Sequence, residues 1–186
     1  MANERLFNEP KPVSRFYLAS RLAFEDWTNP TVAELNANPT NDPDGLIWNL
    51  TCALSQENTT HNLGESETDE ELSFCQVAGA VTPITKNAEI EWTIFRDRNP
   101  WIEGDVDTES VANLAFSLLA WRGVEYFAIL SVGEAYDQPF AVGDRIKMAG
   151  VATDYIEDVV DAGETVKGTQ SFLSRGDINW NYKLEA

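Results

Sequence analysis

The chain of 186 residues is short of the residues that most catalytic and metal sites need, since it has one histidine, His61, and two cysteines, Cys52 and Cys75. Zinc sites use histidines and cysteines at short spacings, and no such cluster is present. Nucleophilic catalysis needs a base beside its nucleophile, and there is no G-x-S-x-G elbow or glycine-rich phosphate loop. Both cysteines lie in strand-like runs. We expect buried free thiols, with a disulfide left open if the two strands pair.

Basic residues are also scarce: 13 lysines and arginines stand against 31 aspartates and glutamates, for a net charge of −18. Such a surface repels phosphate, which excludes sequence-specific binding of nucleic acid. The longest apolar stretch, residues 111–121, covers only about half a bilayer. Residues 1–11 are polar and do not look like a secretion signal. We therefore expect a soluble protein, made inside a cell and independent of membranes.

The apolar content is typical of a globular protein, with 43% hydrophobic residues and 6 tryptophans spread along the chain. This length suits one domain with a core of its own. We expect a β domain over residues 45–186, preceded by an N-terminal arm over residues 1–44. The arm has a possible strand at residues 16–24 and a short helix at residues 30–37, with Pro30 in its first turn.

Alternation of apolar and polar residues predicts most of the strands. Residues 46–55 alternate over their whole length, and we expect residues 72–78 to be their partner. Residues 88–96 alternate as well, with Ile90, Trp92 and Ile94 on one face. The opposite face then carries Glu89, Glu91 and Thr93, because successive side chains of a strand point to opposite sides.

The C-terminal region contains two alternating runs on either side of Ser174-Arg175-Gly176-Asp177. A glycine at this point supplies the positive φ that a short hairpin turn needs. We therefore expect a hairpin that closes the sheet. Its last strand would have Ile178, Trp180, Tyr182 and Leu184 on one face, and Asp177, Asn179, Asn181 and Lys183 on the other.

Residues 57–71 form a long acidic connection with no lysine or arginine. Its acidic residues are Glu57, Glu65, Glu67, Asp69, Glu70 and Glu71. A connection of this length inside a compact domain is usually functional or disordered, and a merely solvated loop is an equal alternative. If it is functional, its carboxylates require a basic partner surface. The candidate basic residues are Lys11, Arg15, Arg96 and Arg98.

Residues 107–122 are predicted to form the main helix, with capping residues at the start and Gly123 after the end. The helix is apolar on two sides and leaves only Asn113 and Ser117 suited to solvent. The strand that follows, residues 124–131, is also apolar on both faces. One small domain has limited room for both, so we expect neighbouring subunits to bury this surface. The interface candidates are Phe116, Leu119, Phe127 and Ile129.

The remaining acidic clusters favour no specific chemistry. Residues 105–109 resemble the start of a calcium loop but lack its glycine and its distal glutamate. Close carboxylate pairs, such as Glu89 with Glu91, could serve a glycosidase on a β-sandwich, yet such pairs are expected by chance among 31 acids. We therefore expect no enzyme activity, no cofactor and no metal. A ligand-binding or carbohydrate-binding β-sandwich stays as an alternative.

The order of arm, strand, long loop, strands, helix and closing hairpins resembles the tail tube (major tail) proteins of long-tailed bacteriophages. The local pattern runs from Val166-Lys167-Gly168-Thr169 through Phe172 to Ile178-Asn179-Trp180. The tube-forming protein of type VI secretion shares the fold. The resemblance implies a mainly β fold with one α-helix, similar to a β-sandwich or barrel, whose sheets join across subunits into a ring-shaped β-barrel.

The resemblance also implies partners and a location. Six subunits would form a ring, and stacked rings would form a virion tail tube that houses the tape measure protein and conducts DNA to the host. The tube would contact tail terminator and tail-tip proteins, and its subunits would be made in the bacterial cytoplasm. The acidic loop and the arm would bridge rings. A non-contractile tail is the default, and a terminator or hub subunit of similar fold is a further alternative.

The resemblance turns the polar strand faces into candidate lumen residues. The candidates are Glu89, Glu91, Thr93, Asn179 and Asn181. A water-filled barrel requires a sheet that is polar on one face, and carboxylates there would keep DNA from adhering. Alternation alone does not say which solvent the polar face meets, so the outer wall stays an alternative for these residues.

Overall fold

The computed structural model describes residues 14–37, 44–65, 68–69, 82–83, 87–97, 101–102, 105–106, 110–133, 137–159 and 166–186. The main sheet consists of β1 (Ser14–Ser20), β2 (Ile47–Asn49), β3 (Thr60–Leu63), β6 (Ala88–Phe95), β9 (Glu125–Val132), β10 (Arg145–Val159) and β11 (Lys167–Lys183). Two small pairs are β4 (Thr68–Asp69) with β5 (Thr82–Pro83) and β7 (Trp101–Ile102) with β8 (Asp105–Val106). The helices are α1 (Val32–Leu35) and α2 (Val111–Leu119), with 3-10 turns η2 (Arg21–Ala23) and η3 (Thr51–Ala53).

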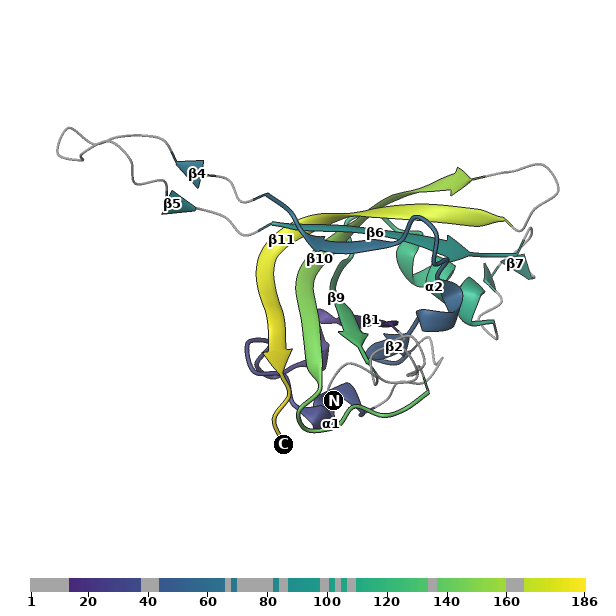
Figure 1. The fold of residues 1–186 in the computed structure, drawn as a ribbon. Coiled ribbons are helices and arrows are strands. Elements are labelled where there is room, and N and C mark those ends of the chain that lie inside the picture. Colours follow the sequence, from purple (N-terminus) through teal and green to yellow (C-terminus); the bar gives the residue numbers. More distant parts are fainter. Residues whose placement is uncertain are drawn as a thin grey trace, which may run out of the picture.

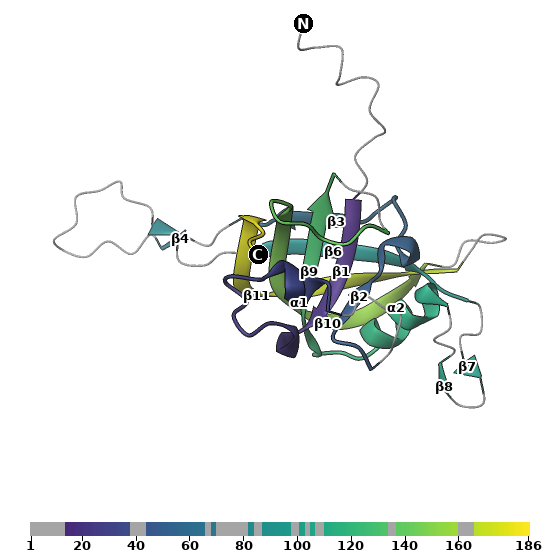
Figure 2. The same cartoon turned by 90° about the horizontal axis from the view of Figure 1, so that it is seen from below.

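The seven strands follow the order β2-β1-β9-β10-β11-β6-β3, and each neighbouring pair is antiparallel. The long strands β10 and β11 run through a strong bend, so that the sheet has a concave and a convex face (Figures 1 and 2). Among the described strands the sheet does not close, and β2 and β3 are its edges. This antiparallel architecture with one main helix confirms the mainly β fold class.

β11 continues through the position where the sequence predicted a hairpin turn. Its register with β10 shifts there, because Ala149 pairs with Ile178 while Val151 pairs with Ser174. Gly176 adopts a φ of 79° inside this irregularity. A glycine with positive φ is typical of a β-bulge as well as of a turn. The expected closing hairpin is therefore wrong, and the glycine lies in a bend of one long strand.

A second irregularity lies at Asn181, which has a φ of 61°. Ile146 pairs with Tyr182 and Lys147 pairs with Trp180, so Asn181 is an extra residue in β11. The side chains change faces there: Ile178 packs in one core and Tyr182 in the other. The prediction that residues 178–184 present a single apolar face is therefore wrong.

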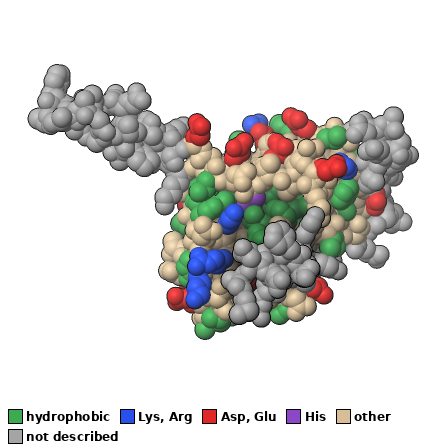
Figure 3. Space-filling view, in the orientation of Figure 1, with side chains coloured by type: hydrophobic (Ala, Val, Ile, Leu, Met, Phe, Trp, Pro, Cys, Tyr) green, Lys and Arg blue, Asp and Glu red, His purple; other side chains and the backbone are tan. Residues whose placement is uncertain are grey.

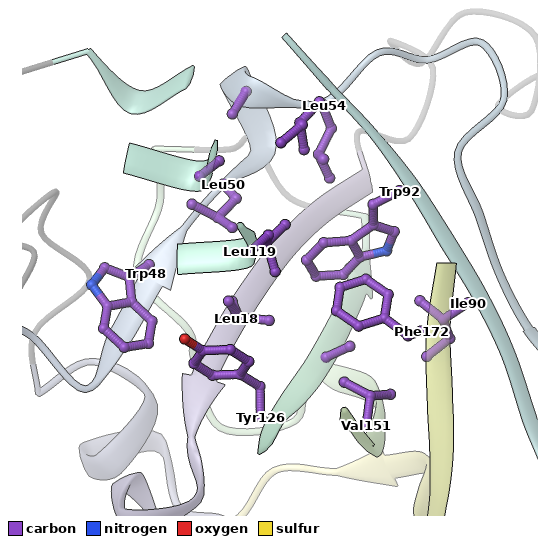
Figure 4. Close-up of a cluster of buried hydrophobic side chains, with 14 of the residues drawn as sticks. Leu18, Trp48, Leu50, Leu54, Ile90, Trp92, Leu119, Tyr126, Val151 and Phe172 are labelled. Atoms are coloured by element: carbon purple, nitrogen blue, oxygen red, sulfur yellow. The ribbon is translucent and has the colours of Figure 1, made fainter. Parts of the chain in front are cut away.

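The concave face holds an apolar core that α2 covers (Figure 4). Trp92 lies at its centre, with its ring 5.2 Å from the ring of Phe172 and 5.8 Å from that of Phe16, both edge to face. Leu119 of α2 and Leu18 of β1 pack in the same cluster. As predicted, the apolar side chains of β6 point into this core.

A second apolar core lies on the convex face, over β1, β9 and the first half of β10. Phe127, Ile129 and Met148 project from the sheet, and Leu35 of α1 covers them. α1 begins at Val32, two residues after the predicted start at Pro30, and a capping box between Thr31 and Glu34 precedes it. β1 pairs with β9 along its whole length. Residues 14–37 therefore contribute a paired strand and a short helix to the folded body, at the places where the sequence suggested them.

α2 is shorter than predicted at both ends, with Ser110 as its N-cap. Its C-cap is Ala120, so the expected helix end next to Gly123 is wrong; Gly123, with a φ of 81°, lies in the turn that leads to β9. Asn113 is fully buried, contrary to the prediction, and its side-chain amide donates to Asp97 Oδ2 at 2.8 Å. A buried amide needs such a partner. Because the helix sequence does not reveal the partner, it predicted that Asn113 would face solvent.

The burial of α2 and β9 needs no neighbouring subunit. Leu119 and Ile129 have 0% exposure and Phe127 has 2%, all within the subunit itself. The two faces of β9 are buried by the two cores, which explains its double-sided apolar pattern. The argument that placed these three residues at a subunit interface is therefore wrong. Phe116 is partly exposed beneath the guanidinium of Arg96, 5.2 Å from its ring centre.

The predicted strand over residues 46–55 is largely wrong, because β2 covers only three residues and η3 follows it. β2 pairs with β1, while residues 72–78, the expected partner, lie outside the described residues, as does Cys75. Cys52 is a free thiol and is exposed, not buried. In the described part of the chain, no helix is long and apolar enough to span a membrane.

Candidate functional site

Among the described residues, the convex face of the sheet is covered in one half and bare in the other. The bare half comprises β3, β6, the first half of β11 and the last part of β10, and its exposed side chains are mostly polar. Thr60 of β3 and Ser171 of β11 both pair with Glu91 of β6. Asn62 pairs with Glu89 in the next row. Figure 3 shows acidic side chains along this upper side of the molecule.

Glu89 is exposed and Glu91 is half-buried, and together they give the bare face its negative charge. Ser171 Oγ donates to Glu91 Oε2 at 3.0 Å, which orients this carboxylate without neutralising it. A shallow open groove of about 690 Å³ runs over this surface, lined mainly by Thr60, Glu65, Glu89, Glu91, Ser171 and Leu173. The face therefore presents fixed carboxylates and neutral donors to solvent.

The bare face lacks the geometry of a catalytic or metal site. Glu89 and Glu91 lie on an open surface, and no group of three or more potential metal-ligating side chains exists among the described residues. The groove is open to solvent, so it favours contact with a surface over chemistry on a small substrate.

Thr93 does not share the exposure of the two glutamates. Its side chain is 2% exposed, and its hydroxyl lies 3.2 Å from Asn58 O and 3.2 Å from Thr169 Oγ1. Residues 58–59 cover it, since Thr59 Oγ1 accepts from the Thr93 amide. Alternation assigned Thr93 to the correct face of β6 but could not show that the chain folds over it. The expected solvent exposure of Thr93 is wrong.

Asn179 and Asn181 lie away from the two glutamates, beyond the bend of β11. Asn179 pairs with Met148, so it shares the convex face, but its side chain donates to Thr28 O at 2.9 Å. Asn181 is exposed at the bulge. The structure thus brings Glu89 and Glu91 together and leaves the two asparagines outside this patch.

The acidic connection at residues 57–71 contains secondary structure. β3 pairs with β6, and β4 pairs with β5, so the segment is not a plain loop. Glu57 and Glu65 are exposed, and the backbone of Asp69 lies in β4. Glu67, Glu70 and Glu71 fall outside the described residues. β4 and β5 project beyond the edge of the main sheet (Figure 1).

A cluster of three cations lies on the concave face at the end of β10 and β11, and sequence reasoning missed it. Arg145 pairs directly with Lys183, and Lys147 pairs with Trp180 two residues further along β10. Basic side chains gather at this end of the two strands (Figure 3). The spacing Arg145-x-Lys147 was the available signal, since residues two apart share a face of a strand.

His61 is the only histidine, and it lies buried beside this cation cluster. Its ring stacks on Trp180 at 5.3 Å and on Trp92 at 6.4 Å. Neither ring nitrogen has a partner with good hydrogen-bond geometry within the described part of the chain, although the backbone of Lys147 lies close by. Burial lowers the pKa of His61 to about 3; the backbone of Lys147 opposes this shift, and the positive charge of Lys147 adds to it. The imidazole is therefore neutral and serves as an aromatic core residue.

A family model described as phage tail tube protein matches residues 11–186 and so includes β1 and α1 as well as the strands that follow. No curated protein matches the chain. An open antiparallel sheet with one main helix and a bare polar face agrees with a structural role. The chain belongs to the phage tail tube protein family, and is a structural protein of the virion tail that assembles with itself into a tube.

Proposed function

We propose that six copies of this chain form a ring and that stacked rings form a tube that conducts viral DNA. The bare half of the convex face, with Glu89 and Glu91, lines the lumen. The observation that carries this proposal is the asymmetry of the sheet. Under β6 and the first half of β11 the concave face is sealed by the subunit's own core. The convex face of the same strands is polar and, apart from residues 58–59 over Thr93, no described element covers it.

The edges of the sheet support joining between subunits. β2 and β3 are edge strands among the described strands, and an edge strand presents unpaired backbone donors and acceptors. Proteins normally protect such edges by covering them, by charge or by pairing with a neighbour. Pairing of each subunit's sheet with the next would continue the bare face around a ring and close a barrel. The inner wall would then repeat Glu89 and Glu91 in every subunit.

An acidic lumen suits the passage of DNA. Carboxylates and phosphates repel each other, so DNA moves along such a wall without adhering to it. The hydroxyl of Ser171 and the amide of Asn62 keep the wall hydrated between the charges. Before ejection the same lumen would hold the tape measure protein. Terminator and tail-tip proteins would contact the two ends of the tube, which would be assembled in the host cytoplasm into a non-contractile tail.

The first test is electron microscopy of the purified protein in negative stain. We expect hollow tubes built from stacked six-fold rings. A monomer that stays dispersed at micromolar concentration would contradict the proposal and favour a ligand-binding β-sandwich. Single closed rings that never stack would favour a tail terminator or hub subunit.

The second test changes the charge of the lumen. Glu89→Lys combined with Glu91→Lys should still give tubes, because neither side chain lies in a core. Virions with this change should eject DNA more slowly, and the delay should be largest at low ionic strength, where screening is weak.

The matched control is Glu25→Lys with Glu185→Lys, which changes the net charge equally at exposed positions outside the bare face. Its ejection rate should equal that of the wild type. Equal ejection rates for both double variants at low salt would contradict the lumen assignment. A density map with Glu89 and Glu91 on the outer wall would contradict it as well.

A further inference from the structure

We propose that Arg145, Lys147 and Lys183, here called the cation cluster, form the docking site for the acidic segment 57–71 of a second copy of this chain. This inference rests on the proposed function, because stacked rings bring the end of one subunit against another. The proposed docking would be the contact that holds successive rings together. Its main support is the unusual arrangement of charges at the end of β10 and β11.

The cation cluster places like charges next to one another. Arg145 and Lys183 are direct cross-strand partners, and such a pair of equal charges destabilises a sheet. Arg145 Nη1 donates to the backbone oxygen of Asn181 at 3.3 Å, and Lys147 Nζ lies 5.4 Å from the ring centre of Trp180. These contacts hold both side chains in place but leave their charges uncompensated.

The other arginines of the described chain have carboxylate partners. Arg15 contacts Asp144 at 3.2 Å, Arg96 contacts Asp158 at 2.8 Å and Arg122 contacts Asp154 at 2.9 Å. Arg175 and Arg21 both contact Glu125, and Arg21 also contacts Asp177. By contrast, none of the described carboxylates forms an ion pair with a member of the cation cluster. In a chain with 31 acids and 13 bases, three neighbouring unpaired cations indicate a partner outside the subunit.

Two of the basic residues that the sequence offered as partners for segment 57–71 are therefore unsuitable. Arg15 is fully buried against Asp144, and Arg96 is bound to Asp158. Lys11 and Arg98 lie outside the described residues. The cation cluster supplies the exposed positive charge that these residues do not.

The position of the cluster argues against DNA as its partner. Lys147 and Trp180 are on the concave face of the sheet, whereas Glu89 and Glu91 are on the convex face. Cations on the side opposite to the acidic wall do not line the same lumen. The net charge of −18 also opposes the approach of a polyanion, while a short acidic peptide segment carries far less charge.

The acidic segment fits the cluster by charge and by reach. It holds Glu57, Glu65, Glu67, Asp69, Glu70 and Glu71 and no basic residue. Glu57 and Glu65 are exposed, and β4 projects from the edge of the sheet, away from the ends of β10 and β11 of its own subunit (Figure 1). A segment that points away from the cation cluster of its own subunit is placed to meet the cluster of another copy.

The test uses two complementary full-length variants. The first carries Arg145→Glu, Lys147→Glu and Lys183→Glu, which makes the docking site acidic. The second carries Glu65→Lys, Glu67→Lys, Asp69→Lys, Glu70→Lys and Glu71→Lys, which leaves Glu57 as the single acid of the segment and makes the docking segment basic. In each variant alone, segment and site have the same charge. We expect each to need at least about tenfold more protein than the wild type for tube formation, since three surface ion pairs are replaced by repulsion.

A mixture of the two variants should restore tubes. The basic segment of the second variant then meets the acidic site of the first, and the unchanged segment of the first meets the unchanged site of the second. The matched control is Arg122→Glu, Lys167→Glu and Arg175→Glu, which makes the same change in net charge elsewhere. This control should form tubes at nearly the protein concentration that the wild type needs, and mixing it with the second variant should not restore the assembly of that variant. Circular dichroism and urea unfolding check that each subunit folds, and Arg145→Glu with Lys183→Glu replaces the triple variant if Lys147→Glu disturbs the core.

Each outcome has one meaning. Absence of tubes from the wild type would overturn the proposed function itself. In that case, sedimentation of the mixed variants would still show whether the two kinds of subunit bind each other. Wild-type tubes together with normal tubes from both variants would overturn the docking inference alone. Normal tubes from the first variant with reduced binding of a labelled DNA duplex would assign the cation cluster to DNA. Failure of the mixture to assemble would also overturn the inference.

Discussion

His61 is a buried ionisable residue, and its burial makes the stability of the core depend on pH. The rings of Trp92 and Trp180 enclose it, so protonation would place a charge in apolar surroundings beside the cation of Lys147. The cost of such a charge is high unless it is paired. The imidazole of His61 is therefore neutral in the folded state. In the unfolded chain it titrates near the usual pKa of histidine.

We predict that His61→Phe removes a pH dependence of stability. The pKa of His61 is lowered from 6.5 to about 3 on folding. The folded protein thus keeps its full stability above pH 6.5 and loses it as the pH falls from 6.5 toward 3, by up to about 1.4 kcal/mol per pH unit. Phenylalanine keeps the aromatic packing and does not titrate.

The measurement is urea unfolding of both proteins between pH 8 and pH 5, below the concentration that forms tubes. The difference in free energy of unfolding should grow in favour of His61→Phe as the pH falls, because contributions from the acidic surface are common to both proteins. If the free energies of unfolding of the two proteins changed in parallel over this pH range, the pKa of His61 would not be lowered on folding, and the prediction would be wrong.

At the scale of elements, the long strands β10 and β11 set the shape of the molecule. Their pairing is interrupted by three register shifts, and two of these lie beside residues with positive φ, Gly176 and Asn181. Bulges bend a strand and increase its twist. Because of the shift at Asn181, Trp180 faces His61 and Tyr182 faces the second core, so one strand supplies both cores.

We predict that the conformation of Asn181 tolerates glycine but not a β-branched residue. Its φ of 61° lies in the left-handed region, which glycine and asparagine adopt most readily. Asn181→Gly should leave the free energy of unfolding nearly unchanged, while Asn181→Val should reduce it by about 1–2 kcal/mol. Thermal unfolding measures both, and Asn62→Val on the edge strand β3 is the control with ordinary extended geometry. A loss for Asn181→Val no greater than for Asn62→Val would contradict a strained bulge.

The strand β6 could be predicted from sequence, whereas β10 and β11 could not. Ile90, Trp92 and Ile94 alternate without interruption, and each packs in the core as expected. In β11 the bulges break the alternation, so a local pattern suggested a turn at Gly176. The burial of Asn113 depends on Asp97, a partner sixteen residues away that no local pattern identifies. In the candidate site, Glu89 and Glu91 followed from alternation, while the cation cluster depends on the pairing of Arg145 with Lys183 across two strands.

At the scale of the whole molecule, charge opposes assembly. Each subunit carries a net charge of −18, so copies repel one another at long range while their specific contacts act only at close approach. Ionic strength separates the two effects because screening weakens distant interactions first.

We predict that tube formation requires a minimum ionic strength. The protein concentration needed for tubes should fall as NaCl rises from roughly 10 mM to roughly 150 mM, since the Debye length shrinks from about 30 Å to about 8 Å. Light scattering follows assembly, and sucrose of equal osmolality controls for general solvent effects. If the required concentration instead rises steadily from the lowest salt, close ion pairs would outweigh the repulsion between subunits.

The two edges of the sheet are different strands, and this difference has a consequence for the direction of growth. Among the described strands, one edge is the three-residue β2 and the other is the four-residue β3, with β4 beyond it in the chain. A join between unlike edges is heterologous, so all subunits of a ring point the same way around it. The upper and lower rims of such a ring are then unlike, and a stack of them is a polar filament. Its two ends expose different surfaces, which allows a capping protein to recognise one end and ignore the other.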